Sequence, residues 1–171
     1  MFDATNINWA LYEDGTEFRG MPQATLPNIT YITQTLTGAG IGGNVDTAVI
    51  GHIESMRLTL NFPTVTKQSI VLAEPRRHNI DLRAAVQDED TVNGVIVVRA
   101  VKNIMVVEPV AHNPGNVAPA ARSDGSGEYS VLSWAMYIDD EQTLDIDPLN
   151  MRFFVNGVDY LASVRKALGR Q

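Results

Sequence analysis

The chain has 171 residues, 44% hydrophobic and 19% charged, which is typical of a globular domain and excludes disordered and collagen-like chains. It contains no cysteine, so disulfides, thiolate catalysis and cysteine-ligated zinc are excluded. Its formal net charge of −7 disfavours a sequence-reading DNA-binding domain, because an acidic protein is repelled by nucleic acid phosphates.

The first third of the chain is short of charge. Residues 20–45 contain no Asp, Glu, Lys, Arg or His. Within them, residues 28–37 are dense in β-branched and aromatic side chains, which predicts a strand. The glycine cluster at residues 38–44 predicts a turning or mobile loop, and we expect the chain to be an exposed loop over about residues 38–52.

Residues 54–62 alternate between apolar and polar side chains, the pattern of a strand with one buried face. Pro63 ends this strand, and Thr64 is expected to cap a short helix that runs to about Ala73. The buried side is predicted to carry Met56, Leu58, Leu60 and Phe62, and the opposite side Ser55, Arg57, Thr59 and Asn61.

The middle of the chain is also predicted to be rich in strands. Residues 80–86 alternate, and residues 94–107 are nearly all Val and Ile, which favours two strands or one long bent strand. Residues 109–127 are rich in Pro, Ala, Gly, Asn and Ser, which predicts a long exposed loop. Strand character returns at residues 128–138 and 144–155, on either side of an acidic turn.

The C-terminal segment predicts a helix from about Asp159 to Leu168. Arg165 and Lys166 fall near its negative end, where cations complement the helix dipole. One face is expected to carry an apolar stripe of Leu161, Val164 and Leu168.

Together these elements predict a single domain, residues 1–171, of the α+β class and rich in β-structure. We expect a β-sandwich or partial barrel with a short middle helix and a C-terminal helix. The exposed loops are expected at about residues 38–52 and 109–127.

One motif formally matches a nucleotide-binding fingerprint. Gly38, Gly40 and Gly43 have the spacing G-x-G-x-x-G and follow a predicted strand. A dinucleotide-binding unit needs a crossover helix that begins in this glycine run. Residues 44–52 leave little room for one, contain Gly51 and lead directly into the next strand, so the sequence disfavours nucleotide binding.

No other motif indicates chemistry. His52, His78 and His112 are scattered, and we interpret them as surface or loop histidines. The acidic clusters at residues 88–90 and 139–141 lack the alternating ligands of a calcium loop and are interpreted as charged turns that protect strand edges. The sequence therefore predicts no enzyme: no catalytic residues, no cofactor and no metal site. It predicts no signal peptide or membrane anchor either, since no segment approaches the roughly 20 apolar residues of a membrane helix.

Four stretches, taken in order, resemble the major tail tube protein of contractile-tailed bacteriophages, a family shared with the tubes of R-type bacteriocins. The first two are Tyr12-Glu-Asp-Gly15 with Phe18-Arg-Gly20 and Leu26-Pro27, then Gly38-Ala-Gly40, Gly42-Gly43 and Val45-Asp46 up to Gly51 and Glu54. The third is Ser133-Trp-Ala-Met-Tyr-Ile-Asp-Asp140. The fourth and most specific is Asp145-Ile-Asp147-x-x-Asn150 with Val155-Asn-Gly-Val-Asp159, Leu161, Arg165 and Leu168-Gly169.

The resemblance implies a structural subunit of a phage tail. Six copies would form a ring whose sheets complete one large β-barrel, and the rings would stack into a rigid tube that is driven through the host envelope and conducts DNA. The partners implied are further copies of the chain, the tail sheath protein, and the baseplate and tail terminator proteins. DNA would pass through the lumen without specific binding, in a virion tail assembled in the bacterial host cytoplasm.

The resemblance also suggests roles for particular residues. The glycine loop would reach across a contact between subunits or rings, and the polar side of residues 55–61 would face the lumen. Arg165 and Lys166 would face the sheath, although complementing the helix dipole explains these cations equally well. The loop residues are Gly38, Gly40, Gly42, Gly43 and Asp46, and the lumen candidates are Ser55, Arg57, Thr59 and Asn61.

Two alternatives stay open at this point. The tube of an R-type bacteriocin or a related contractile injection system would look alike and would carry no DNA. A small-molecule-binding β-barrel module, from a different functional class, would instead be a monomer with a closed concave pocket.

Overall fold

The computed structural model describes residues 2–170, most of them in antiparallel strands. The helices are α1 (Lys67–Val71), α2 (Ala162–Ala167) and the single 3-10 turn η1 (Pro148–Asn150). The predicted β-rich architecture with two short helices is confirmed. The strands are β1 (Phe2–Glu13), β2 (Glu17–Gly20), β3 (Gln23–Thr25), β4 (Tyr31–Leu36), β5 (Val45–Ile53), β6 (Met56–Phe62), β7 (His78–Asp90), β8 (Val95–Asn113), β9 (Gly125–Ile138), β10 (Glu141–Asp147), β11 (Arg152–Val155) and β12 (Val158–Asp159).

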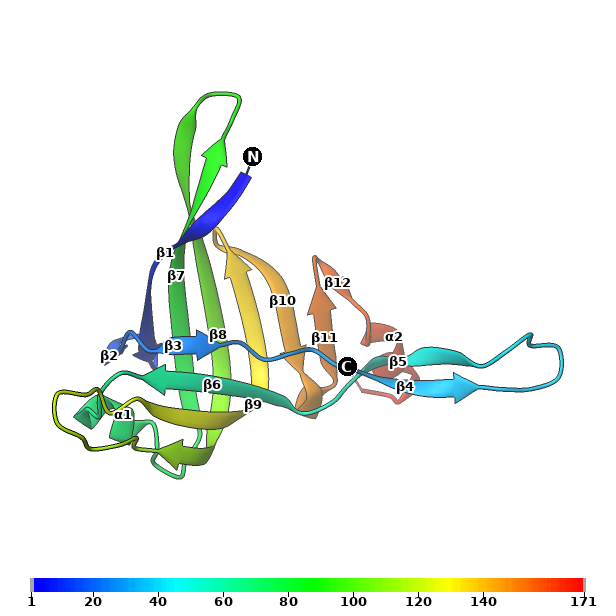
Figure 1. Ribbon diagram of the computed structural model, residues 1–171. Helices are drawn as coiled ribbons and strands as arrows, with labels where there is room; N and C mark the ends of the chain where they lie inside the picture. The colour runs from blue at the N-terminus through cyan, green and yellow to red at the C-terminus, as the bar shows by residue number, and fades with distance from the viewer. Residues whose placement is uncertain (1, 171) are drawn as a thin grey trace.

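A ten-stranded sheet forms the body of the protein, in the order β12-β11-β10-β9-β8-β7-β1-β2, and β6 and β3 branch from β9. The long strand β9 belongs to both the main row of strands and the branch: its first half pairs with β6, and its second half pairs with β10. The β6–β3 pair therefore crosses in front of β7, β8 and β9 (Figure 1). The branching sheet thus supplies both layers of the fold.

The hydrophobic core lies between these two layers. On β6 the predicted alternation is observed, with Arg57 and Asn61 exposed and Thr59 half-buried on the outer side. Each fully buried large apolar side chain contributes roughly 1.5–3 kcal/mol relative to an exposed one, so the inner side of β6 fixes the second layer on the first. The core side chains of β6 are Met56, Leu58, Leu60 and Phe62; Tyr129 and Val131 lie beside them on β9, and the same core includes Leu11, Ile80, Leu82, Met105 and Val107.

Two hairpins project from this body (Figure 1). Strands β4 and β5 form a separate two-stranded sheet, here called the arm (residues 31–53). The distal parts of β7 and β8 form the second projection, here called the extension (residues 87–99), which continues past the end of β9. The N-terminal part of β1 pairs with the β7 side of the extension.

Two tight turns follow the sequence signals for hairpins. Asp139 and Asp140, at φ 49° and 65°, join β9 to β10. Asn156 and Gly157, at φ 48° and 85°, join β11 to β12. Positive φ at both central residues suits the twist of an antiparallel hairpin, and Asn, Asp and Gly adopt it most readily.

Both expected loops are shorter than predicted. The loop expected over residues 38–52 becomes strand β5 at Val45, because the β-branched residues there pair with β4. The loop expected over residues 109–127 covers only residues 114–124. Strand β8 continues through Pro109 because the β8–β9 register shifts between Pro109 and Ala111, and a bulge tolerates the missing proline N–H.

The helices also differ from the expectation in detail. Thr66, not Thr64, caps α1, and its hydroxyl accepts a hydrogen bond from the Ser69 amide at 3.2 Å. In the C-terminal segment Leu161 is buried and Val164 is half-buried, but Leu168 is 63% exposed. The apolar stripe is therefore shorter than predicted, because α2 ends at Ala167 and Leu168 lies beyond it.

The close approach of Tyr129 to Gly127 gives a stability prediction. A Cβ on Gly127 would lie 2.6 Å from the Tyr129 hydroxyl, which is buried and has little room to move. We expect Gly127→Ala to lower the free energy of unfolding by about 1–3 kcal/mol. Gly42→Ala is the control, since a Cβ there meets nothing within 4 Å. Urea denaturation measures both, and equal stabilities of the two variants would contradict the packing argument.

Candidate functional site

The arm is the most exposed part of the chain. Every residue from 31 to 50 is exposed, although the arm is apolar and carries a single charged residue before position 51. Contiguous exposed apolar surface often marks an interaction site, whereas single exposed apolar residues are common on any protein. The large apolar side chains exposed on the arm are Tyr31, Ile32, Leu36, Ile41, Val45, Val49 and Ile50.

The glycine loop forms the tip of the arm. Gly38, Gly40, Gly42 and Gly43 all have open space where a side chain would be, and Gly40 adopts φ 92°. Asp46 lies beside the loop on β5, where its carboxylate accepts a hydrogen bond from the Thr35 hydroxyl at 2.7 Å. The structure therefore places the five predicted loop residues together at or near an exposed tip. Asp46 itself stabilises the arm by bridging its two strands.

The base of the arm rests on the C-terminal part of the chain. Gly51 adopts φ 66°, and a Cβ there would lie 2.5 Å from the Leu161 side chain. The Tyr31 ring lies 6.0 Å from Phe153, which lies 6.3 Å from Tyr160. A cavity of about 300 Å³ lies among these rings and residues 48–51 in the second half of β5. The closing segment of the chain, residues 145–170, thus determines the direction in which the arm leaves the body.

The closing segment is held by a polar network around Arg165. Its guanidinium pairs with the Asp159 carboxylate and donates to the Met151 carbonyl at 2.8 Å. The Asp159 carboxylate also accepts the Leu161 amide at 3.1 Å. Hydrogen bonding from Arg165 holds the pKa of Asp159 below its ordinary value, although burial opposes this. We call the network formed by Asp159, Arg165 and Met151 the clasp.

A second part of the same segment is ordered by Asp147. Its carboxylate accepts the Asn150 amide at 3.3 Å and the Asn150 side chain at 2.6 Å, which caps η1. Arg152 lies 3.4 Å from both Asp145 and Asp147. The spacing Asp145-x-Asp147-x-x-Asn150 is therefore a structural motif that sets the turn before β11.

The two predicted sheath-facing cations have different surroundings. Arg165 is engaged within its own chain by the clasp, with its side chain only 21% exposed. Lys166 is exposed next to it. Of the two, Lys166 is the residue whose charge is directed to the solvent.

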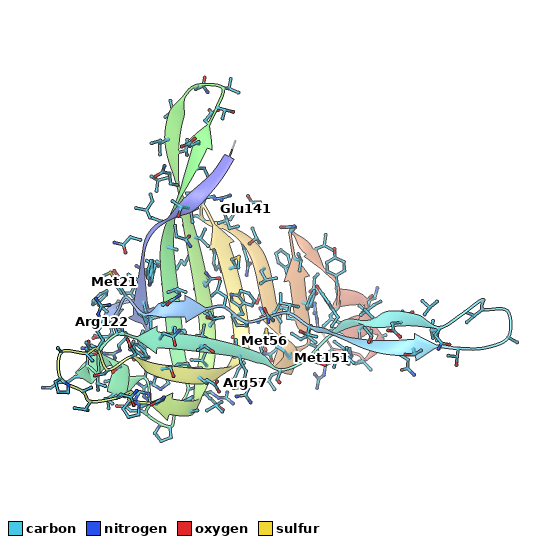
Figure 2. All side chains as sticks on the ribbon, viewed as in Figure 1. Met21, Met56, Arg57, Arg122, Glu141 and Met151 are labelled. Carbon is cyan, nitrogen blue, oxygen red and sulfur yellow. The ribbon has the colours of Figure 1, made fainter. Side chains whose placement is uncertain are left out.

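The lumen candidates lie on the outer side of β6. Arg57 and Asn61 are exposed and Thr59 is half-buried, while Ser55 is exposed just before the strand begins. Figure 2 labels Arg57 beside its buried neighbour Met56 on β6. Arg57, Thr59 and Asn61 therefore share the outer side of β6, where Thr59 is partly covered, and Ser55 precedes them.

A buried ionic cluster was not predicted from the sequence. The Glu13 carboxylate is fully buried and accepts hydrogen bonds from Arg19 and Arg76, each at 2.7 Å. The His78 ring is also fully buried, with Nδ1 2.7 Å from Glu13 and Nε2 3.0 Å from the Glu74 carbonyl. These contacts join β1, β2 and β7 to the segment that follows α1.

The expectation that all three histidines are surface or loop residues is wrong for two of them. His78 has the same parity as Ile80 and Leu82 on β7, so it points into the core, and this alternation could have revealed it. His112 lies on β8, and its two ring nitrogens are buried without a partner, as is the Tyr129 hydroxyl. Burial raises the pKa of Tyr129 to about 12. Only His52 is exposed.

The described part of the chain shows no cluster of metal-binding side chains. Within residues 2–170, no three His, Asp or Glu side chains are grouped so that they could hold a metal ion. None of the helices in this range is long and apolar enough to span a membrane.

These features describe a protein built on one large β-sheet with two exposed apolar projections. Residues 5–169 match the phage tail tube protein FII family, and the chain belongs to this family. The resemblance seen in the sequence is therefore confirmed, and the chain is a non-enzymatic tail tube protein. Among curated proteins, none matches the sequence.

Two solved structures share the fold. A chain of the sheath–tube complex of an extracellular contractile injection system, PVC, in the extended state superposes with a TM-score of 0.51 at 12% identity, over 76% of this chain and 88% of that one. A chain from the sheath/tube terminator of the PVC system gives a TM-score of 0.50 at 13% identity, over 77% and 94%. At these identities the likeness concerns the fold.

The buried cluster predicts a pH-dependent contribution of Glu13 to stability. Burial by itself raises the pKa of Glu13, but the hydrogen bonds from His78, Arg19 and Arg76 outweigh it and hold the pKa below its ordinary value. A lowered pKa in the folded state stabilises the protein above the ordinary glutamate pKa of about 4.3, and this contribution is lost as the pH falls further.

We expect Glu13→Gln to lower the free energy of unfolding at pH 7 by about 1.5–3 kcal/mol, because the charge-assisted hydrogen bonds from Arg19 and Arg76 to a buried carboxylate are lost. The variant should also lose less stability than the wild type between neutral and acidic pH. Denaturant titrations over a pH series measure both quantities. Identical pH slopes for the two proteins would show that Glu13 is not the titrating group.

The clasp gives a second prediction with a neighbouring control. Arg165→Ala should lower the midpoint of thermal unfolding, because the Met151 carbonyl and the Asp159 carboxylate lose their donor. Lys166→Ala should leave the midpoint unchanged, since Lys166 is exposed. Arg165→Lys should restore little, because one ammonium does not reproduce the planar guanidinium fork. Equal effects of the two alanine variants would contradict this assignment.

Proposed function

We propose that this chain is the inner tube subunit of a contractile phage tail, in which homohexameric rings stack into a hollow tube inside a sheath. Sheath contraction would drive this tube through the host envelope. The task is mechanical, so the subunit must resist axial load through contacts between copies and perform no bond chemistry. The observation that carries the proposal is family membership over residues 5–169, together with an apolar arm that its own chain leaves uncovered.

The arm supports the self-assembly part of this proposal. Its tip, containing Gly38, Gly40, Gly42, Gly43 and Asp46, would cross a contact between subunits or rings. A segment with a single charged residue, Asp46, costs little to desolvate, and exposed side chains such as Ile41 and Ile50 would gain burial in the contact. The sheets of six copies would together complete one large barrel, whose bore grows with the number of strands.

The polar outer side of β6 supports the proposal that this strand lines the water-filled lumen of the tube. In this arrangement Ser55, Arg57, Thr59 and Asn61 would line the lumen while the other side of β6 stays in the subunit core. The net charge of −7 of the whole subunit suits a conduit for DNA, because an acidic protein offers phosphates few binding sites, and Arg57 is the single charged residue among the four candidates. DNA would therefore slide through without specific binding.

The proposed partners follow from the same assembly. The two related structures are described as parts of sheath–tube and sheath/tube terminator complexes, which supports a sheath and a terminator as partners of this chain. A baseplate would start the tube. Lys166 is the better placed of the two sheath-facing candidates, since Arg165 is engaged in the clasp. Assembly would take place in the bacterial host cytoplasm, before the tail becomes part of the virion.

A contractile injection system without DNA is the second candidate. The fold shared with the PVC particle favours it, because that particle is described as an extracellular contractile injection system. An R-type bacteriocin tube belongs to the same category. A small-molecule-binding module would use a cavity such as the one of about 370 Å³ lined by Trp9, Leu26 and Val86, and it would remain a monomer.

Electron microscopy of the purified protein tests the proposal directly. We expect rings or stacked tubes for the wild type. Deletion of residues 38–43 should abolish the tubes and leave the fold intact, because the loop is exposed and a Cβ on Gly38, Gly40, Gly42 or Gly43 would meet nothing within 4 Å.

A deletion of residues 117–120, in the other exposed loop, is the control for shortening a loop. Normal tubes from the arm deletion would contradict the role of the loop. A stable wild-type monomer at high concentration, with ligand in its cavity, would contradict the tube function itself.

A further inference from the structure

The part of β8 in the extension is apolar although it is exposed to solvent. Val95, Ile96, Val97 and Val98 are consecutive apolar residues on β8, and all four are exposed, by 54%, 60%, 40% and 61%. A half-buried strand alternates apolar and polar residues, as β6 does. A continuous apolar run is typical of a strand that is buried on both faces. In the single chain this strand is buried on neither face.

The same strand has an open backbone edge. Strand β7 pairs with one side of residues 95–99, whereas β9 begins to pair with the other side only at Val101. The backbone groups of Ala100 point to that second side, because both of them bond to Asp139, each at 2.9 Å. Backbone direction alternates along a strand, so the N–H and C=O of Val98 and Ile96 point to the same open side. No strand among residues 2–170 pairs with them.

Charges beside the open edge restrict what can approach it. The β9–β10 turn, with Asp139, Asp140 and Glu141, lies at the end of the sheet from which the extension emerges (Figure 2 labels Glu141). Glu89 is exposed on the extension itself. A second extension approaching this edge would bring these carboxylates together, which is unfavourable. A strand without carboxylates is the favoured partner.

We propose that the open edge of β8 at residues 95–98 is a strand-pairing site for β4 of the arm of a second copy. This rests on the proposed self-assembly and names the surface that receives the arm. Strand β4 carries no charge, all its residues are exposed, and one of its edges is unpaired. Its apolar side chains, such as Ile32 and Leu36, would extend the apolar faces of the Val95–Val98 run. Main-chain hydrogen bonds give affinity in this mode of recognition.

The contact is heterologous, because a donor arm and an acceptor edge are different surfaces of the same chain. Each copy that donates its arm still has a free acceptor edge. Such contacts form rings or open filaments and do not stop at a dimer. The arrangement therefore accounts for propagation from one copy to the next.

A proline at residue 98 tests the backbone edge. Val98→Pro removes an N–H that points away from β7, so the extension keeps its own hydrogen bonds. We expect the protein concentration needed for tube formation to rise about tenfold or more, with unfolding unchanged. Val98→Thr keeps the N–H and the β-branched shape and serves as the matched control. Wild-type-like tubes from Val98→Pro would overturn the proposal, whereas absence of tubes from the wild type would overturn the tube function instead.

Cross-linking tests the identity of the partner, and the chain is suited to it because it has no cysteine. Ile96→Cys is combined in one chain with Thr33→Cys or, in a second variant, Gln34→Cys, and the assembled protein is mildly oxidised. A ladder of covalent multimers from a double variant is expected, with none from the single variants. Dimers from Ile96→Cys alone would show the edge pairing with itself, and no ladder from either double variant would exclude β4. Either result overturns the proposal.

Discussion

The structure depends on one constraint: the backbone groups and apolar faces of a β-sheet need partners, and this chain does not provide all of them. Within the body, β9 resolves the problem by pairing with β6, β8 and β10, so two layers enclose a core. Outside the body, the arm and the extension remain uncovered. A sheet protein that leaves long apolar hairpins open risks uncontrolled aggregation unless a specific partner covers them. In the proposed tube, identical subunits would supply that partner in every copy.

Polar interactions fix the parts that packing alone does not. The cluster around Glu13 ties the first hairpin to the segment after α1, and the clasp ties the end of the chain to Met151. Both networks are short-range and directional, so they set orientation more than they add stability. Because Leu161 follows the clasp residue Asp159 and packs on Gly51, the clasp also sets the base of the arm.

The predictable part of this fold is the part with a simple period. The alternation on β6 and the acidic turn at residues 139–140 were visible in the sequence, and the structure agrees. Strand β5 was missed because the neighbouring glycines indicated a loop, although its β-branched residues pair with β4. The buried partnership of Glu13 with His78 was invisible because the two residues are far apart in the chain. Long-range pairing of polar residues leaves no local pattern.

The C-terminal residues that carry the resemblance to the family have structural roles that connect them with the arm. Asp147 and Asn150 set the turn before β11, and Asp159 with Arg165 closes the end of the chain. None of these side chains lies at the tip of the arm. Their common effect is to hold the surface on which Gly51 and the arm base rest. A rigid base reduces the entropy lost when an arm docks on another copy. In the proposed assembly, these four residues would act through the direction of the arm, while the contacts between copies would be made by apolar strands.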